Sequence, residues 1–390
     1  MSGSRGNKTA RIAGRVARTI AARAAAVPVQ PERSRVINKL EAIITQDIGG
    51  RGLAVDPNDN LVTRCRGNLA RAASHLATEG SAVAIVTGFF IAHAATPSIE
   101  TDGPCGAIAL TWLLTKLGYT VTLVTDPLGE PAIAAGLRAA PIDAGAATVH
   151  VFPFEQAETG VAERSLDDPR PRRRSLDYVE SFFRSGPGES LTHLLAIERA
   201  GPSWSESARP SNNADSRRFA ELCPPDHQNQ VHSFRGQIIT DQTAPTHLLF
   251  DFIRENNLPV RTIGIGDGGN EIGMGSIPWS VIHANIPSGL GARIACRVAT
   301  DWTIACGVSN WGAYALGTAV AWLRGRPELL GEWTDECERA VLAALVAAGA
   351  VDGVTGQPTM SVDGLPLERH LAVWGQIRDA ARLESTGVKS

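Results

Sequence analysis

The chain has 390 residues, of which 43% are hydrophobic and 20% charged, and its formal net charge is −3. This composition is typical of a globular protein and excludes disordered, collagen-like and disulfide-scaffold chains. The longest apolar run, residues 82–95, is too short to cross a bilayer and contains a histidine, so we expect no membrane partner.

The first 30 residues hold six basic and no acidic side chains, so the acidic excess falls on the rest of the chain. An acidic body argues against nucleic acid as a partner. The Arg- and Ala-rich tail has the character of a mitochondrial transit peptide, although the chain's overall preference for arginine over lysine explains such a tail equally well. We predict an intracellular protein, mitochondrial if residues 1–30 are a transit peptide and cytoplasmic otherwise.

The six cysteines show neither a CxxC pair nor the spacing of zinc ligands, so we interpret them as reduced thiols. No HExxH or GxSxG motif is present, and Cys105 at a helix start has no identifiable base, so zinc hydrolase and serine or cysteine nucleophile chemistry lack support. The expected partner is a small molecule, and a homo-oligomer is compatible with the sequence.

Hydrophobic periodicity from residue 31 onward predicts alternating helices and buried strands. This alternation is typical of βαβ units, so we predict a single three-layer α/β/α domain over residues 31–390, with a mainly parallel sheet and a helical C-terminal region. In chain order, the predicted elements are a helix over 33–44, a helix over 60–78, a strand over 82–91, a helix over 104–117, a strand over 120–125, a helix over 131–139, strands over 148–152 and 192–197, a helix over 243–256, strands over 260–265 and 302–308, and helices over 310–323, 328–348 and 367–383.

Two segments interrupt this order. Residues 158–190 combine clustered arginines with prolines around one short predicted helix, and residues 201–232 are polar and almost without periodicity. Excursions of about thirty residues in a compact domain are usually lids, binding loops or insertions. We predict that both are surface insertions in the single domain.

Acidic residues follow four of the predicted strands. Because open α/β sheets bind ligands beyond the carboxyl ends of their strands, we expect these residues to line a site, where their charges repel unless a cation or protons neutralise them. Helix capping is the alternative explanation, most plainly for Asp102. The residues are Glu100 and Asp102 after the first strand, Asp126 after the second, Glu198 after the fourth, and Asp267 and Glu271 after the fifth.

The segment Gly266 to Gly275 has five glycines in ten residues and matches neither the Walker pattern nor GxGxxG. Its carboxylates, Asp267 and Glu271, suit a hard cation such as Mg²⁺ or Mn²⁺, or an ammonium group, better than a phosphate. The alternative is a tight turn with Asp267 as an N-cap.

Glu198 and Arg199 pair a possible general acid/base with a carboxylate-binding guanidinium, and Arg235 is a second such guanidinium. Either arginine could instead pair with a neighbouring acid. The residues alone therefore predict an acidic cavity but do not identify a substrate. They leave open a metal-dependent phosphatase or nucleotide-binding α/β protein and a non-catalytic amino-acid or metal binding protein, beside enzymes of other classes.

Six motifs in order resemble the D-glutamate cyclase family, in particular the C-terminal domain of its mitochondrial members and the stand-alone microbial relatives. They are TDGPCGA (101–107), IERAG (197–201), RGQIIT (235–240), GDGGNEIGMG (266–275), GVSNWGA (307–313) and VDGVTG (351–356). The sequence departs from the family pattern at Cys105, in the loop after residue 201 and in the expanded 158–190 segment.

The resemblance implies a lyase that cyclises D-glutamate to 5-oxo-D-proline with loss of water, assisted by a divalent cation, Mn²⁺ or Mg²⁺. The residues carried over by motif are Asp102, Glu198, Asp267, Asn270 and Glu271. Together with our own analysis of the strand ends, the predicted site has as metal ligands Asp102, Asp267 and Glu271; as catalytic residues Glu198, Arg199 and Arg235; and as substrate-binding residues Gly268, Gly269, Asn270, Ser309 and Asn310.

Overall fold

The computed structural model describes residues 31–154, 170–208 and 213–387. The predicted tail, residues 1–30, lies outside this part of the chain, so its role in targeting stays a prediction. No helix among the described residues is both long and apolar enough to cross a membrane.

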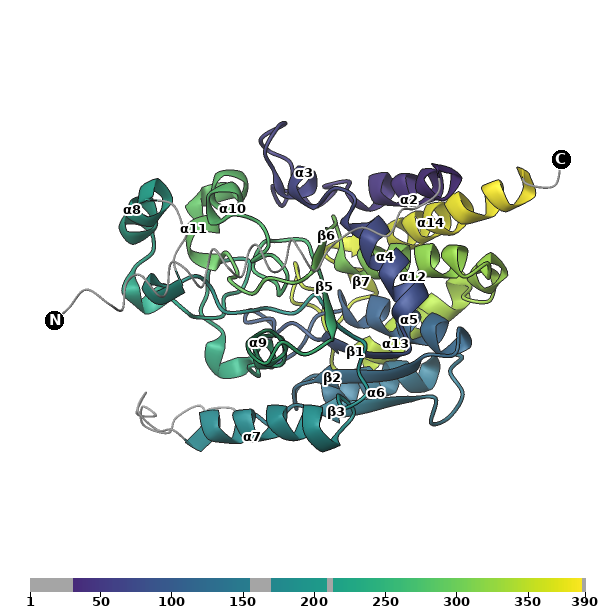
Figure 1. The fold of residues 1–390 in the computed structure, drawn as a ribbon, viewed down its shortest axis with the longest axis horizontal. Coiled ribbons are helices and arrows are strands. Elements are labelled where there is room, and N and C mark those ends of the chain that lie inside the picture. The colour runs from purple at the N-terminus through teal and green to yellow at the C-terminus, as the bar shows by residue number, and fades with distance from the viewer. Residues whose placement is uncertain (1–30, 155–169, 209–212, 388–390) are drawn as a thin grey trace.

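A six-stranded parallel sheet forms the centre of the fold, with the strand order β3-β2-β1-β4-β5-β6. The sheet lies between two groups of helices, which confirms the predicted three-layer α/β/α architecture (Figure 1). The strands are β1 (Ala82–Thr87), β2 (Thr120–Thr125), β3 (Ala147–Val151), β4 (His193–Ile197), β5 (Arg261–Gly266) and β6 (Trp302–Ala305), and a separate hairpin pairs β7 (Ser361–Val362) with β8 (Leu365–Pro366).

The helices divide between the two faces of the sheet because successive strand residues point to opposite faces. In β1, Val83 and Ile85 pack into one apolar core, whereas Ala84 and Val86 pack into the other. The first face is covered by α2 (Pro31–Ile44), α4 (Asn68–Glu79), α5 (Pro104–Lys116), α6 (Glu130–Ala139), α12 (Ser309–Leu323), α13 (Asp335–Ala347) and α14 (Leu367–Gly387). The second is covered by α3 (Leu61–Cys65), α7 (Arg170–Ser185), α8 (Asn213–Leu222), α9 (His247–Glu255), α10 (Trp279–Asn285) and α11 (Gly291–Ile294).

Several predicted boundaries were wrong for local reasons. The helix predicted over 60–78 is two helices, α3 and α4, because Gly67 has a φ of 76° between them. The predicted strand 82–91 ends at Thr87, where Gly88 turns the chain with a φ of 103°. The helix predicted over 328–348 is a 3₁₀ turn, η5 (Pro327–Gly331), followed by α13.

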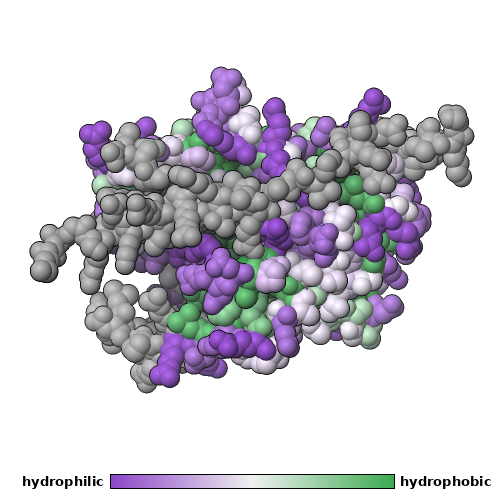
Figure 2. All heavy atoms as spheres, in the orientation of Figure 1, coloured by the Kyte–Doolittle hydropathy of each residue, from purple (hydrophilic) through white to green (hydrophobic). Residues whose placement is uncertain are grey.

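Both predicted insertions contain helices on the second face of the sheet. In the first, α7 packs on α9, where the rings of Phe183 and Phe252 stack 5.2 Å apart. The second holds α8, although its sequence showed almost no periodicity. Figure 2 shows hydrophobic surface between α9 and α7 among hydrophilic side chains, where a groove of about 550 Å³ includes Leu176 and Leu248 in its lining.

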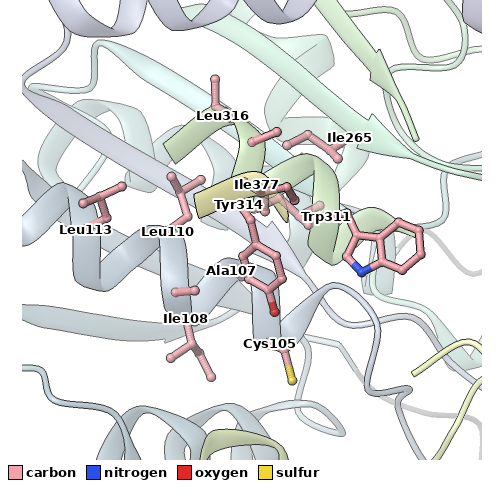
Figure 3. Close-up of a cluster of buried hydrophobic side chains, with 14 of the residues drawn as sticks. Cys105, Ala107, Ile108, Leu110, Leu113, Ile265, Trp311, Tyr314, Leu316 and Ile377 are labelled. Atoms are coloured by element: carbon pink, nitrogen blue, oxygen red, sulfur yellow. The ribbon is translucent and has the colours of Figure 1, made fainter. Parts of the chain in front are cut away.

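Helices α5 and α12 are the most deeply buried pair on the first face, and both begin at the carboxyl edge of the sheet. Figure 3 shows side chains of α5, such as Leu110, packed beside Tyr314 and Leu316 of α12. The helices approach closely at Gly106, where a Cβ atom would lie 2.7 Å from Cα of Asn310.

We predict that Gly106→Ala lowers the free energy of unfolding by about 1–3 kcal/mol, because overpacking a tight contact outweighs the better helix propensity of alanine. Urea denaturation measures this change. The matched control is Gly375→Ala in α14, where a Cβ would have no neighbour within 4 Å, so the same substitution should stabilise the protein slightly. Equal effects of the two substitutions would contradict the close contact.

Candidate functional site

The strand order places a crevice between β1 and β4. The chain runs from β1 outward through β2 to β3 on one side, and from β4 outward through β5 to β6 on the other. This reversal is the switch point at which open parallel sheets bind ligands beyond the carboxyl ends of their strands. Glu198 directly follows β4 and Asp267 directly follows β5 at this edge.

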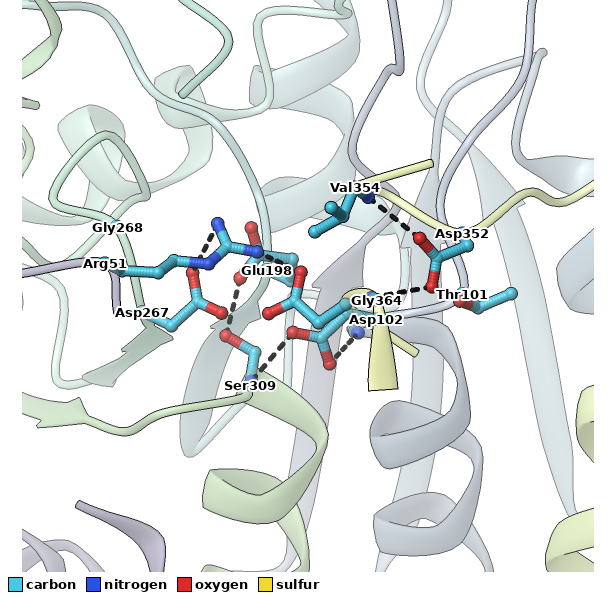
Figure 4. A network of polar contacts seen from close by, with 12 residues as sticks. Arg51, Thr101, Asp102, Glu198, Asp267, Gly268, Ser309, Asp352, Val354 and Gly364 are labelled. Carbon is cyan, nitrogen blue, oxygen red and sulfur yellow. Dashed lines mark hydrogen bonds and ion pairs between the residues drawn. The ribbon is translucent and has the colours of Figure 1, made fainter. Parts of the chain in front are cut away.

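Three buried carboxylates, which we call the acidic cluster, meet at the switch point. Asp102, Glu198 and Asp267 each offer an oxygen, and these oxygens all lie within 4.8 Å of one another (Figure 4). Both carboxylate oxygens of Asp267 are buried and accept no hydrogen bond. Carboxylate oxygens that converge in this way fit a hard divalent cation such as Mg²⁺ or Mn²⁺. Two of the three residues, Asp102 and Asp267, are among the metal ligands that the sequence predicted.

Asp102 and Asn310 cap each other's helices. The Asp102 carboxylate accepts the backbone N–H groups of Ser309 and Asn310, each at 2.8 Å, at the start of α12. In return, Oδ1 of Asn310 accepts the N–H groups of Gly103 and Gly106 at the start of α5. Asp102 therefore caps a helix, as the sequence alternative held, and one of its oxygens still lies beside those of Glu198 and Asp267. The amide oxygen of Asn310 accepts backbone N–H groups rather than facing a substrate.

Glu198 is held in an unusual backbone conformation. Its φ is 43°, in the left-handed region that non-glycine residues rarely adopt and that clusters at functional sites. Its Oε2 accepts a hydrogen bond of 2.6 Å from Oγ of Ser309. Gly103 packs against the base of the same side chain, since a Cβ at residue 103 would lie 2.6 Å from Cβ of Glu198. The hydrogen bond from Ser309 and this close packing together restrict the Glu198 side chain.

Glu271 organises the glycine-rich loop instead of joining the three carboxylates. Its two oxygens accept the N–H groups of Gly268 and Gly269 at 2.7 and 2.8 Å, so these donors are not available to a ligand. The structure therefore gives Glu198 the place in the acidic cluster that was predicted for Glu271. Asn270 donates from Nδ2 to the carbonyl of His232, and its buried Oδ1 has no hydrogen-bond partner.

Arg199 points away from the crevice, although its neighbour Glu198 faces it. The guanidinium is fully buried and donates to Oδ2 of Asp126 at 2.8 Å, to Oγ1 of Thr246 and to the carbonyls of Gly88 and Ala244. Its donors tie loops of the scaffold together, which is the alternative that the sequence left open for it. Asp126 is engaged with it and lies outside the acidic cluster.

A cavity of about 220 Å³ opens onto the cluster. Glu100 and Glu198 line it at the acidic end, and Asn270 also reaches it. Arg235 is exposed at the same cavity and donates from Nη2 to the carbonyl of Val354 at 2.7 Å. The remaining wall is largely apolar, and it includes Phe89, Phe90, Ile91 and Phe234.

Arg51, Asp363 and Asp352 are site residues that the sequence analysis missed. Nη1 of Arg51 lies 3.3 Å from Oδ1 of Asp267, and Nη2 pairs with Oδ1 of Asp363. Asp352 holds the loop that carries Asp363, because its carboxylate accepts the N–H groups of Val354 and Gly364 (Figure 4). The glycines around residue 51 and the VDGVTG motif were the available signals, but neither shows that two loops so distant in sequence meet.

Burial and mutual repulsion raise the pKa values of the acidic cluster and of Glu100 beside it. Desolvation raises the pKa of Asp102 to about 7 and raises the pKa values of Glu100, Glu198 and Asp267 well above their usual range, with neighbouring carboxylates adding to the effect. Arg51 opposes these shifts through its positive charge. The cluster thus favours bound protons or a cation, as expected at a functional site.

Comparison with known proteins places the chain in a family. The family described as D-glutamate cyclase-like, C-terminal, matches residues 40–378. The chain belongs to the D-glutamate cyclase-like family. It is also similar to the human mitochondrial D-glutamate cyclase, with 28% identity over 364 residues, which cover 85% of this chain and 50% of the human protein. The chain therefore spans about half the length of that relative.

The matched residues 40–378 of this D-glutamate cyclase-like chain include every residue of the acidic cluster and all six motifs named above. Arg51 and Asp363, which the motifs do not contain, also lie within the match. The family assignment thus covers the sheet, the crevice and the loops that close it.

We predict that the metal-free D-glutamate cyclase-like domain loses stability as the pH rises from about 6.5 to 8. The folded state keeps protons on carboxyl groups that the unfolded chain has already released, so the free energy of unfolding falls with increasing pH. The window starts at about 6.5 because burial lowers the pKa values of His193, His232 and His247, whose effect on stability has the opposite sign at lower pH.

Urea midpoints in the presence of a chelator test this expectation. Saturating Mn²⁺ should remove the decline, because a cation favours the ionised carboxylates. A midpoint that rises over the same window without metal would contradict the raised pKa values.

Proposed function

We propose that this protein is a lyase that cyclises D-glutamate to 5-oxo-D-proline with loss of water, assisted by a divalent cation. The observation that carries the proposal is the buried meeting of Asp102, Glu198 and Asp267 at the switch point of a chain in the D-glutamate cyclase-like family. Similarity to the human mitochondrial D-glutamate cyclase supports the substrate and a mitochondrial location. In this proposal the binding partner of the chain is a small molecule, an amino acid.

The cavity supports binding of an amino-acid dicarboxylate. Its acidic end suits the substrate's ammonium group, for which the unpaired Oδ1 of Asn270 is an acceptor. Arg235 at the exposed end is a donor for the α-carboxylate. Its Nη2 donates to the carbonyl of Val354, so the other N–H groups of the guanidinium can bind the substrate. A volume of about 220 Å³ agrees with a substrate of this size.

Ring closure needs a neutral amine and a departing oxygen that receives protons. The ammonium nitrogen gives up two protons as it forms the C–N bond, and the γ-carboxylate loses one oxygen, which takes up both protons as water. Glu198 is suited to relay them, because burial and the neighbouring carboxylates raise its pKa and so make it a better proton acceptor than an exposed glutamate. Glu100 lines the same cavity and is a second carboxyl group with a raised pKa.

Asp102 and Asp267 would hold the divalent cation, with the carboxylate of Glu198 beside them for proton transfer. When bound, the cation supplies Lewis-acid polarisation of the γ-carboxylate. Asp102 contributes a fixed position, since the helix start of α12 holds its carboxylate, and Ser309 orients Glu198 through its hydroxyl. Arg199 acts in this proposal as a positioning residue, which ties Asp126 and the carbonyl of Gly88 to the strand end beside Glu198.

The central experiment incubates the purified chain with D- or L-glutamate, with and without Mn²⁺ or Mg²⁺, and measures 5-oxoproline by chiral chromatography. We expect product from D-glutamate that disappears on chelation. Folded protein that forms no product from either isomer would overturn the proposal, and release of phosphate from phosphate esters would favour the metal-dependent phosphatase alternative.

We predict that Glu198→Gln lowers kcat by about 10²- to 10⁴-fold with little change in KM, because glutamine keeps the shape and can still accept from Ser309 but cannot relay a proton. Steady-state kinetics with D-glutamate measure the effect. Ser309→Ala, which removes only the orienting hydroxyl, should lower kcat less. Parallel losses in kcat and substrate affinity for Glu198→Gln would indicate a structural role.

We predict that Asp267→Asn abolishes the metal-dependent part of the activity and leaves the fold intact, because an amide supplies one neutral oxygen where a carboxylate supplied two charged ones. Turnover at increasing Mn²⁺ measures this loss. The control is Asp59→Asn, which removes a carboxylate that is paired with Arg64 on the surface. Unchanged turnover of Asp267→Asn at saturating metal would remove Asp267 from the ligand set.

A further inference from the structure

Arg51 is a cation placed directly on the acidic cluster. Nη1 lies 3.3 Å from Oδ1 of Asp267, Nη2 pairs with Oδ1 of Asp363, and the guanidinium lies over the ring of Phe234, 5.1 Å from its centroid. Its side chain is 13% exposed and lines the cavity. The two nitrogens therefore contact two carboxylates with different surroundings, because Asp267 belongs to the three converging carboxylates and Asp363 does not.

The backbone that carries Arg51 is fixed, so the side chain is the part that can change partner. The Asp47 carboxylate accepts the N–H groups of Arg51, Gly52 and Leu53 at 2.8, 2.9 and 3.1 Å. Gly52 has a φ of 91°, and a Cβ there would lie 2.4 Å from the carbonyl oxygen of Asn285, so this turn is tightly constrained. Asp363 and Phe234 then hold one edge and one face of the guanidinium.

Asp267 cannot serve Arg51 and a divalent cation equally well. A cation bound among Asp102, Glu198 and Asp267 would repel the guanidinium at this short distance, most strongly in a buried site of low dielectric constant. The contact of Nη1 with Asp267 is the one that repulsion would break, since Nη2 is paired outside the three converging carboxylates. A freed Nη1 would remain at the cavity wall, with a donor available for a new anion.

We propose that Arg51 is the resident counter-ion of the acidic cluster, and that Nη1 exchanges Asp267 for a carboxylate of a dicarboxylic amino acid when a divalent cation binds. This inference rests on the proposed function and adds to it the residue that couples cation binding to substrate binding. Asp363 keeps the guanidinium in place throughout the exchange. The cation and the substrate then bind cooperatively, because each takes the place of one half of the Arg51–Asp267 ion pair.

Mn²⁺ binding, measured from the electron paramagnetic resonance signal of the free ion, tests the displacement without turnover. We expect Arg51→Gln to bind Mn²⁺ at least about fivefold more tightly than the unsubstituted chain, since no cation has to leave Asp267. Arg51→Lys keeps a charge near Asp267 and should stay close to the unsubstituted chain. The matched control is Arg235→Gln. It removes an arginine charge from the same cavity, but Arg235 donates to the carbonyl of Val354 and not to a carboxylate of the acidic cluster.

Glutarate, a five-carbon dicarboxylate without an amine, tests the second half of the proposal by calorimetry. In the unsubstituted chain Mn²⁺ should tighten glutarate binding at least about fivefold, and glutarate should tighten Mn²⁺ binding by the same factor. In Arg51→Gln both couplings should disappear while Mn²⁺ binding stays tight. This coupling is measurable on the unsubstituted protein, so the test does not depend on any variant folding.

Three results would overturn the proposal: Mn²⁺ affinity of Arg51→Gln no higher than that of the unsubstituted chain, an equal gain in Arg235→Gln, or no coupling between Mn²⁺ and glutarate. The proposed function is tested by a separate measurement, the turnover of D-glutamate by the unsubstituted chain. Product formation without coupling would refute only the role of Arg51. Coupling without product would refute the cyclase reaction and leave the exchange at Arg51 in place.

Discussion

Five carboxyl groups buried around one guanidinium are the constraint on which the rest of this structure depends. Buried charges are costly unless they are paired or hydrogen-bonded, so the surrounding elements must supply positive partners. The parallel sheet does so by directing the N-terminus of α12, with its free N–H groups, at the same edge. The loop around Arg51 supplies the charged partner. The five groups are Glu100, Asp102, Glu198, Asp267 and Asp363.

The buried carboxylates at this edge of the sheet, with Glu271 added to the five above, differ in their hydrogen-bond partners. Asp102 and Glu271 accept several backbone N–H groups and hold helix starts or loops in place. The Asp267 carboxylate accepts none, and it forms an ion pair with Arg51. A carboxylate that is desolvated but not hydrogen-bonded is the group most ready to exchange its partner. The scaffold thus combines carboxylates fixed by hydrogen bonds with one, Asp267, that has an ion pair but no hydrogen bond.

The sequence predicted most of the sheet and half of the site, for reasons visible in particular residues. β2 was predicted with its observed bounds, because five of its six residues are β-branched and the run lies between the turn signals Gly118 and Pro127. Asp102, Glu198 and Asp267 were predicted because acids after strands converge at one edge. Arg51 was missed because its contacts with Asp267 and Asp363 join loops more than 200 residues apart, and no local periodicity records such a meeting.

The prediction for Arg199 shows a second limit of sequence reasoning. The left-handed backbone at Glu198 turns the chain directly after β4. Glu198 faces the crevice, whereas Arg199 donates to the carbonyl of Gly88 and to Asp126 in the scaffold. The pattern of an acid beside an arginine predicted a joint role, whereas backbone geometry separates the two side chains. Glu271 was similarly assigned by composition, since its residue type suits a metal, but the loop's own N–H groups occupy it.

The left-handed backbone at Glu198 has a consequence for how this protein can be stabilised. A non-glycine residue in this conformation costs of order 1–3 kcal/mol, which glycine would not incur. A search for thermostable variants that scores folding alone would therefore select against the carboxylate at this position. The strand end is a place where stability and activity trade against each other, and engineering of this domain has to leave that strain untouched.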